Sequence, residues 1–124
     1  MSCMRTRSVW AATLAAIASL STFATPAQAQ WGVWGADSLL AAGRVSAAES
    51  LYYAASSASP RDPAARAALG RYLAARGALR IGAVLLEEAR VFGGDTASLA
   101  RALVPVYGAL GDYRALAALP LSPL

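Results

Sequence analysis

Several residue types are missing from this 124-residue chain, and each absence excludes a kind of chemistry. There is no histidine, lysine or asparagine, and the one cysteine is Cys3. Without histidine, the commonest general base and the commonest metal ligand are both absent. The chain after Cys3 has no thiolate nucleophile, disulfide or cysteine metal site. We therefore expect no catalytic residue, no cofactor and no metal ion, and no enzymatic activity unless the chain is a fragment of a longer enzyme.

Long apolar runs and concentrated charge are also missing. Hydrophobic residues make up 57% of the chain, but many are alanine, which favours helix while burying little area. No apolar run reaches the ~20 residues that a membrane-spanning helix needs. From residue 30 onward, nine arginines stand against seven acidic residues, a net charge of +2, without a basic block. Nucleic-acid binding needs a concentrated positive face, so we do not expect it.

The first 29 residues have the pattern of a secretory signal peptide. Arginines precede an alanine-rich apolar stretch, Val9–Leu20, and an Ala-x-Ala motif ends at Ala29. This order predicts cleavage between Ala29 and Gln30. We expect an exported protein, periplasmic or secreted, with no stable membrane span after cleavage. An uncleaved membrane anchor is the alternative.

From Gln30 onward, helical patterns alternate with glycine or proline breaks. The first helix is the least regular, because Gly32 and Gly35 weaken it, and we expect its firm part to start near Gly35. Asp62 and Pro63 suit the N-cap and first position of the third helix. The expected helices cover residues 30–42, 45–58, 63–76, 79–92, 96–110 and a final short segment that stops at Pro120.

An internal repeat of 34 residues organises these helices. Gly43, Gly77 and Gly111 are spaced by this period, and each stands where one helix must turn into the next. Other positions recur in the same register. Small residues that would let paired helices approach closely are Ala36, Ala48, Gly70 and Gly82, and large residues that would fill the space beside them are Leu39, Tyr52, Leu73 and Leu86.

These columns resemble the tetratricopeptide repeat, whose 34-residue unit has small-residue positions, a central glycine and a closing proline. The resemblance covers residues 30–120, with 121–124 as a C-terminal tail. It implies an all-α fold of antiparallel helix hairpins in a right-handed superhelix of about two and a half repeats. A generic alanine-rich helical bundle is the alternative.

The resemblance also implies a protein or peptide partner that lies against the first helix of each repeat. The family's groove positions fall here on Trp34, Asp37, Leu40, Ala67, Arg71, Ala74, Arg101 and Pro105. Arg71 and Arg101 could bind an acidic partner by bidentate hydrogen bonds, or could be ordinary solvated arginines. Trp31 and Trp34 could form a hydrophobic cap or an exposed anchor. The family's carboxylate clamp depends on asparagines, which are absent, so it is not carried over.

We therefore expect an exported interaction scaffold without catalytic activity of its own. The alternative is the N-terminal repeat module of a longer exported enzyme, for example a retropepsin-like aspartic protease. The chain ends without the polar helix that usually covers the last repeat of a solenoid. This predicts an exposed apolar edge, available for self-association, at Tyr107, Leu110, Leu116 and Leu119.

Overall fold

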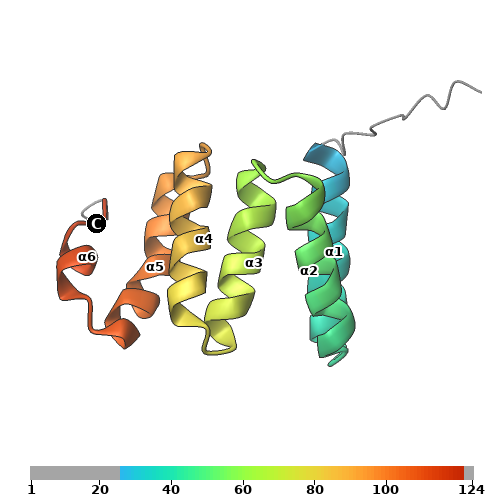
Figure 1. The fold of residues 1–124 in the computed structure, drawn as a ribbon, viewed down its shortest axis with the longest axis horizontal. Helices are drawn as coiled ribbons and strands as arrows, with labels where there is room; N and C mark the ends of the chain where they lie inside the picture. The colour runs from blue at the N-terminus through green and yellow to red at the C-terminus, as the bar shows by residue number, and fades with distance from the viewer. Residues whose placement is uncertain (1–25, 122–124) are drawn as a thin grey trace, which may run out of the picture.

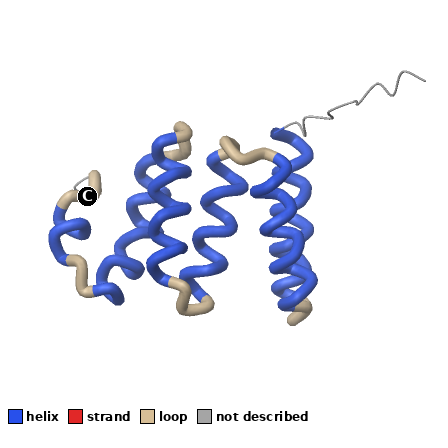
Figure 2. The backbone as a smooth tube through the Cα atoms, viewed as in Figure 1, coloured by secondary structure: helices blue, strands red, loops and turns tan. Residues whose placement is uncertain are grey.

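The computed structural model describes residues 26–121, and within this range all regular structure is α-helical (Figures 1 and 2). The leader prediction falls mostly on residues 1–25, outside the described residues, and stays a prediction. The helices are α1 (Pro26–Ala41), α2 (Val45–Ala58), α3 (Pro63–Ala75), α4 (Leu79–Val91), α5 (Thr96–Leu110) and α6 (Tyr113–Ala117). The all-α prediction is confirmed for residues 26–121.

The helices pack as antiparallel hairpins in the order of the chain. The most extensive contacts join α1 to α2 and α3 to α4, and α6 packs against α5. Between hairpins, α3 contacts both α1 and α2, and α5 contacts both α3 and α4. In Figure 1 the hairpins therefore follow one another along the long axis, with α1 and α2 at one end and α6 at the other.

The three glycines of the 34-residue repeat make the same turn. Gly43, Gly77 and Gly111 have φ values of 77°, 91° and 70°, in the left-handed region that favours glycine. The amide after each glycine donates to the carbonyl five residues earlier, as from Ala78 to Leu73 over 2.9 Å. These paired turn bonds define a Schellman motif, which satisfies the last carbonyls of a helix. The recurrence of glycine is therefore explained by the left-handed backbone conformation that each turn requires.

At the small-residue positions the paired helices approach each other closely. A Cβ atom placed on Gly82 would lie 2.8 Å from the Ala74 Cβ and 2.9 Å from the Gly70 carbonyl oxygen. In the first hairpin, Ala36 and Ala48 occupy the corresponding positions and are 0% exposed. Side chains larger than these would push the helices apart. The small residues therefore set the spacing within each hairpin.

The core is a line of buried residues that runs through consecutive hairpins. One cluster comprises Ala36, Ala48, Tyr52, Ala68, Leu69, Tyr72, Leu73 and Leu85, from α1 to α4. A second comprises Ala67, Ala83, Leu86, Ala89, Leu99, Ala100, Leu103, Val106 and Leu119, from α3 to the segment after α6. Because each cluster draws on neighbouring hairpins, no hairpin buries its apolar side chains alone.

Aspartate is the N-cap residue of α3, α5 and α6. Asp62 accepts a hydrogen bond from the amide of Ala64 at 3.3 Å, and Pro63 follows at the first helical position, as predicted. Asp95 caps α5 and Asp112 caps α6, over 2.9 and 3.0 Å. Each carboxylate satisfies an amide that has no partner within its own helix.

The first helix is longer than the sequence indicates. It begins at Pro26 and continues through Gly32 and Gly35, whereas we expected its firm part to start near Gly35. A Cβ on Gly32 would lie 3.2 Å from the Ala55 Cβ, so this glycine lies where α2 packs closely against α1. Packing against α2 offsets the helix propensity that the glycines lose. The predicted cleavage position, between Ala29 and Gln30, lies within α1.

The C-terminal edge is better covered than we predicted. Leu119 is buried in the same cluster as Leu99 and Leu103, and Tyr107, Leu110 and Leu116 are half-buried. After the short α6, the amide of Leu119 bonds to the carbonyl of Leu116 at 3.3 Å, which turns the chain back toward α5. The prediction of an exposed apolar edge at these four residues is therefore wrong.

The close approach at Gly82 makes a specific prediction about stability. Gly82→Ala should lower the free energy of unfolding by about 1–3 kcal/mol, because its methyl group overlaps α3. Gly108→Ala, in α5, is the matched control: no atom lies within 4 Å of its added Cβ, and helix propensity favours alanine by about 1 kcal/mol. Urea unfolding measures both changes. A Gly82→Ala variant as stable as Gly108→Ala would contradict the close packing.

Candidate functional site

Three hollows lie along the surface that α1, α3 and α5 form, here called the first-helix face. One, of about 380 Å³, separates α1 from α3; its lining includes Val33, Asp37, Leu40, Tyr52, Tyr72 and Arg76. The second, of about 350 Å³, lies between α3 and α5. The third, of about 370 Å³, lies where α3 and α5 begin. Arg71 lines all three hollows, so this one side chain stands at their junction.

Arg71 is exposed and has no carboxylate partner within residues 26–121. Among the described residues, ion pairs join Arg66 to Glu88 at 3.6 Å and Arg90 to Glu87 at 3.0 Å. Neither pair involves Arg71, whose guanidinium is therefore available to an outside group. A guanidinium offers a planar fork of donors that fits a carboxylate or phosphate.

The hollow between α3 and α5 has mostly apolar walls beside Arg71. Its other lining residues are Ala74, Ala75, Leu79, Leu86, Ala102, Pro105 and Val106. Apolar walls lower the local dielectric constant, which strengthens a charge interaction at their rim. A ligand with a negative group and adjacent apolar groups would satisfy both features.

Two tyrosines form hydrogen bonds between the helices that surround the hollow between α1 and α3. The Tyr52 hydroxyl, on α2, donates to Asp37 of α1. The Tyr72 hydroxyl, on α3, donates to Glu49 of α2 over 2.7 Å. The two rings stack with centroids 5.0 Å apart. Stacking stabilises the pair beyond what the burial of the two rings contributes. The carboxylate of Asp37 is thus engaged within the protein.

A third tyrosine makes the same kind of bond on the other face. The Tyr107 hydroxyl, on α5, donates to Glu87 of α4 over 2.8 Å. Burial is the largest cause and this hydrogen bond the next largest, and together they raise the pKa of Tyr107 to about 12. Burial and then the hydrogen bond to Asp37 raise the pKa of Tyr52. For Tyr72, the hydrogen bond to Glu49 is the largest cause of a raised pKa, and burial is the next. All three hydroxyls therefore favour their protonated, donating form.

The structure brings together most of the predicted groove residues. Asp37, Leu40 and Arg71 line the hollow between α1 and α3. Ala74 and Pro105 line the second hollow and Ala67 the third.

Two of the predicted residues lie outside these hollows. Arg101 is exposed on α5. Trp34 is 52% exposed and packs edge to face against Trp31, with ring centroids 5.1 Å apart. Because Trp31 is 68% exposed as well, the pair is not a buried cap.

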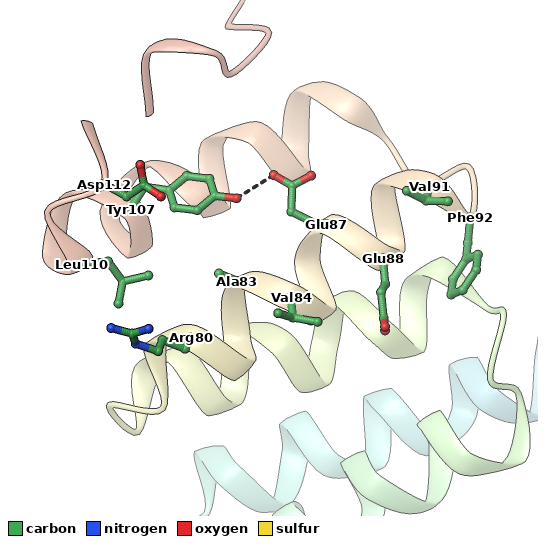
Figure 3. A pocket seen from close by; sticks show the side chains of 10 residues that line it. All are labelled: Arg80, Ala83, Val84, Glu87, Glu88, Val91, Phe92, Tyr107, Leu110 and Asp112. Atoms are coloured by element: carbon green, nitrogen blue, oxygen red, sulfur yellow. Dashed lines mark hydrogen bonds between the residues drawn. The ribbon is translucent and has the colours of Figure 1, made fainter. Parts of the chain in front are cut away.

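A larger hollow on the opposite face was not expected from the sequence. It has a volume of about 600 Å³ and lies between α4 and the end of α5 (Figure 3). Arg80, Val84, Glu88 and Val91 line it along α4, with Tyr107 and Leu110 across from them. A usable signal was present: Val84 and Val91 lie outside the core columns of the repeat, where a polar residue is usual.

Residues 26–121 contain no group of three or more acidic, cysteine or histidine side chains that could hold a metal ion. No helix in this range is long and apolar enough to cross a membrane. No protein-family model, curated protein or solved structure matches the chain.

The tyrosine hydroxyls predict how stability depends on alkaline pH. The pKa of Tyr107 is higher in the folded protein than its ordinary value of 10.0. The stabilisation is therefore fully present below pH 10 and is lost as the pH rises toward about 12. Urea unfolding at a series of pH values should show this loss, and Tyr107→Phe should remove part of it. An identical pH dependence in Tyr107→Phe would contradict the role given to this hydroxyl.

Proposed function

We propose that this chain is a tetratricopeptide-like scaffold that binds a segment of a partner protein on its first-helix face. Sequential hairpins and the identical glycine turns at Gly43, Gly77 and Gly111 support the family resemblance. Arrays of this kind form a right-handed superhelix whose inner wall is built from first helices. The scaffold has no catalytic activity of its own.

The observation that carries this proposal is the position of Arg71. It is exposed, lacks an ion-pair partner among the described residues, and borders three hollows along the face. An arginine whose only role was to be solvated at the surface would not need to border three hollows. A partner carboxylate at Arg71 would form charge-assisted hydrogen bonds, which are stronger than neutral ones.

The preferred ligand follows from the lining of the hollows. It is a peptide segment with an aspartate or glutamate at its centre and apolar side chains on both sides. The acidic group meets Arg71, with Arg76 nearby in the hollow between α1 and α3. The apolar side chains enter the adjoining hollow beside Pro105 and Val106.

We also propose that this binding takes place outside the cytoplasm. The support is the leader pattern of residues 1–29, in which a basic start, an apolar stretch and an Ala-x-Ala motif follow in order. Cleavage after Ala29 would leave Gln30–Ala41 as the first helix of the array. Cell fractionation tests the location, and the absence of the protein from the exported fraction would contradict it. The mass of the exported protein tests the cleavage, and an uncleaved chain would contradict that part.

Selection from a display library of random peptides tests the ligand class. We expect the recovered peptides to combine an acidic residue with flanking apolar residues. Arg71→Ala should weaken their binding by about tenfold, the scale of one lost charge-assisted hydrogen-bonding pair. Calorimetric titration of the recovered peptides against the wild type and the variant measures the change.

Arg114→Ala is the matched control for that experiment. Arg114 is an exposed arginine of α6, away from the three hollows. Its substitution removes the same charge from the protein and should leave peptide affinity unchanged. Equal losses in the two variants, or recovered peptides without acidic residues, would contradict the assignment to Arg71.

A further inference from the structure

Helix α4 has a second apolar stripe in addition to the one that it buries. Its core side consists of Gly82, Ala83, Leu85, Leu86 and Ala89. On the opposite side, Ile81, Val84 and Val91 are exposed by 58%, 57% and 81%. A helix on the surface of an array normally has a polar outer side, so a helix that is apolar on both sides indicates a further contact.

The repeat itself shows that the fold does not require an apolar residue at the positions of Val84 and Val91. Thirty-four residues earlier, the positions of Arg80, Val84 and Val91 fall on serines of α2 that are also exposed. These are Ser46, Ser50 and Ser57. The two helices occupy the same place in their hairpins, so the difference between their outer sides belongs to α4 and not to the architecture.

The charges along α4 make this surface complementary to itself. Arg80 lies four residues before Val84, and Glu87 and Glu88 lie three and four residues after it, all along the hollow shown in Figure 3. When two copies of such a helix meet antiparallel at Val84, each Arg80 comes to the level of the other copy's glutamates. Opposite charges at this spacing attract and also fix the register.

The charged groups on this surface differ in how far they are engaged within the chain. Arg80 has no ion pair among the described residues. Glu88 pairs with Arg66 through its buried Oε2 atom at 3.6 Å, and the exposed part of its side chain, which is 42% exposed as a whole, is left for Arg80 of a second copy. In the same antiparallel arrangement, Val91 lies opposite Gly77 of the other copy. A Cβ at Gly77 would have no neighbour within 4 Å, so this position leaves room for the valine.

We propose that a second copy of this chain docks on α4, with the two α4 helices antiparallel about a two-fold axis at Val84. The contact is isologous, because the same surface serves both copies. It buries Val84 and Val91 and forms two symmetric ion pairs between Arg80 and Glu88. It does not rest on the proposed peptide binding, since it uses the opposite face of the array.

Disulfide trapping tests the position of the two-fold axis. In a Cys3→Ser background, Val84→Cys introduces the only thiol, and a residue on the axis lies next to its own copy. Mild oxidation should link Val84→Cys into a covalent dimer at least about tenfold faster than Ser50→Cys, the control at the matching position of α2. Equal rates for the two variants would overturn the proposed axis.

Charge reversal tests the ion pairs. Analytical ultracentrifugation should show a concentration-dependent dimer, and Arg80→Glu should raise its dissociation constant by about tenfold or more through repulsion from the glutamates. The double variant R80E/E88R should recover most of the affinity, and Arg101→Glu, on the first-helix face, should not change it. A wild-type chain that stays monomeric, or a double variant without recovery, would overturn the proposal.

Discussion

The close approach of α3 and α4 at Gly70 and Gly82 is the contact on which the rest of the architecture depends. With the Gly70 carbonyl oxygen 2.9 Å from where a Gly82 Cβ would stand, the two helices are as near as their backbones allow. That spacing brings Leu85 and Leu86 against α3 and into the two core clusters. The same contact orients α3 so that Arg71 faces outward between α1 and α5.

Most of the fold could be predicted from the sequence because its determinants are local. The glycine turns need a left-handed backbone, and the aspartate caps need only the next few residues, so both are visible as spacing. The start of α1 and the burial of Leu119 could not be predicted in this way. They depend on contacts with α2 and α5, which override a local propensity or supply a partner that the spacing does not show.

The candidate site was predictable only in part, for a related reason. The repeat register indicates which residues lie on the first helix of each hairpin, and the structure places Asp37, Leu40 and Arg71 together on that basis. The repeat register does not indicate which of these side chains form hydrogen bonds or ion pairs with neighbouring residues. Asp37 accepts a hydrogen bond from Tyr52, whereas Arg71 has no such partner among the described residues, and this difference distinguishes a structural carboxylate from an available cation.

The two faces differ in the physical basis of the binding that we propose for each. On the first-helix face, Arg71 has no ion-pair partner among the described residues and borders three small hollows, which suits a short acidic segment of another protein. On the α4 face, an apolar stripe carries opposite charges on either side of Val84, which suits a copy of itself. If both proposals hold, a dimer of this chain presents two peptide sites at once, which increases avidity without additional contacts.

Hydrogen–deuterium exchange with and without a peptide bound is the measurement that tests this division most directly. The account predicts slower amide exchange in α3 and α5 when an acidic peptide is added, with α4 unchanged at constant protein concentration. Protection confined to α4, or spread evenly over all helices, would contradict the assignment of peptide binding to the first-helix face.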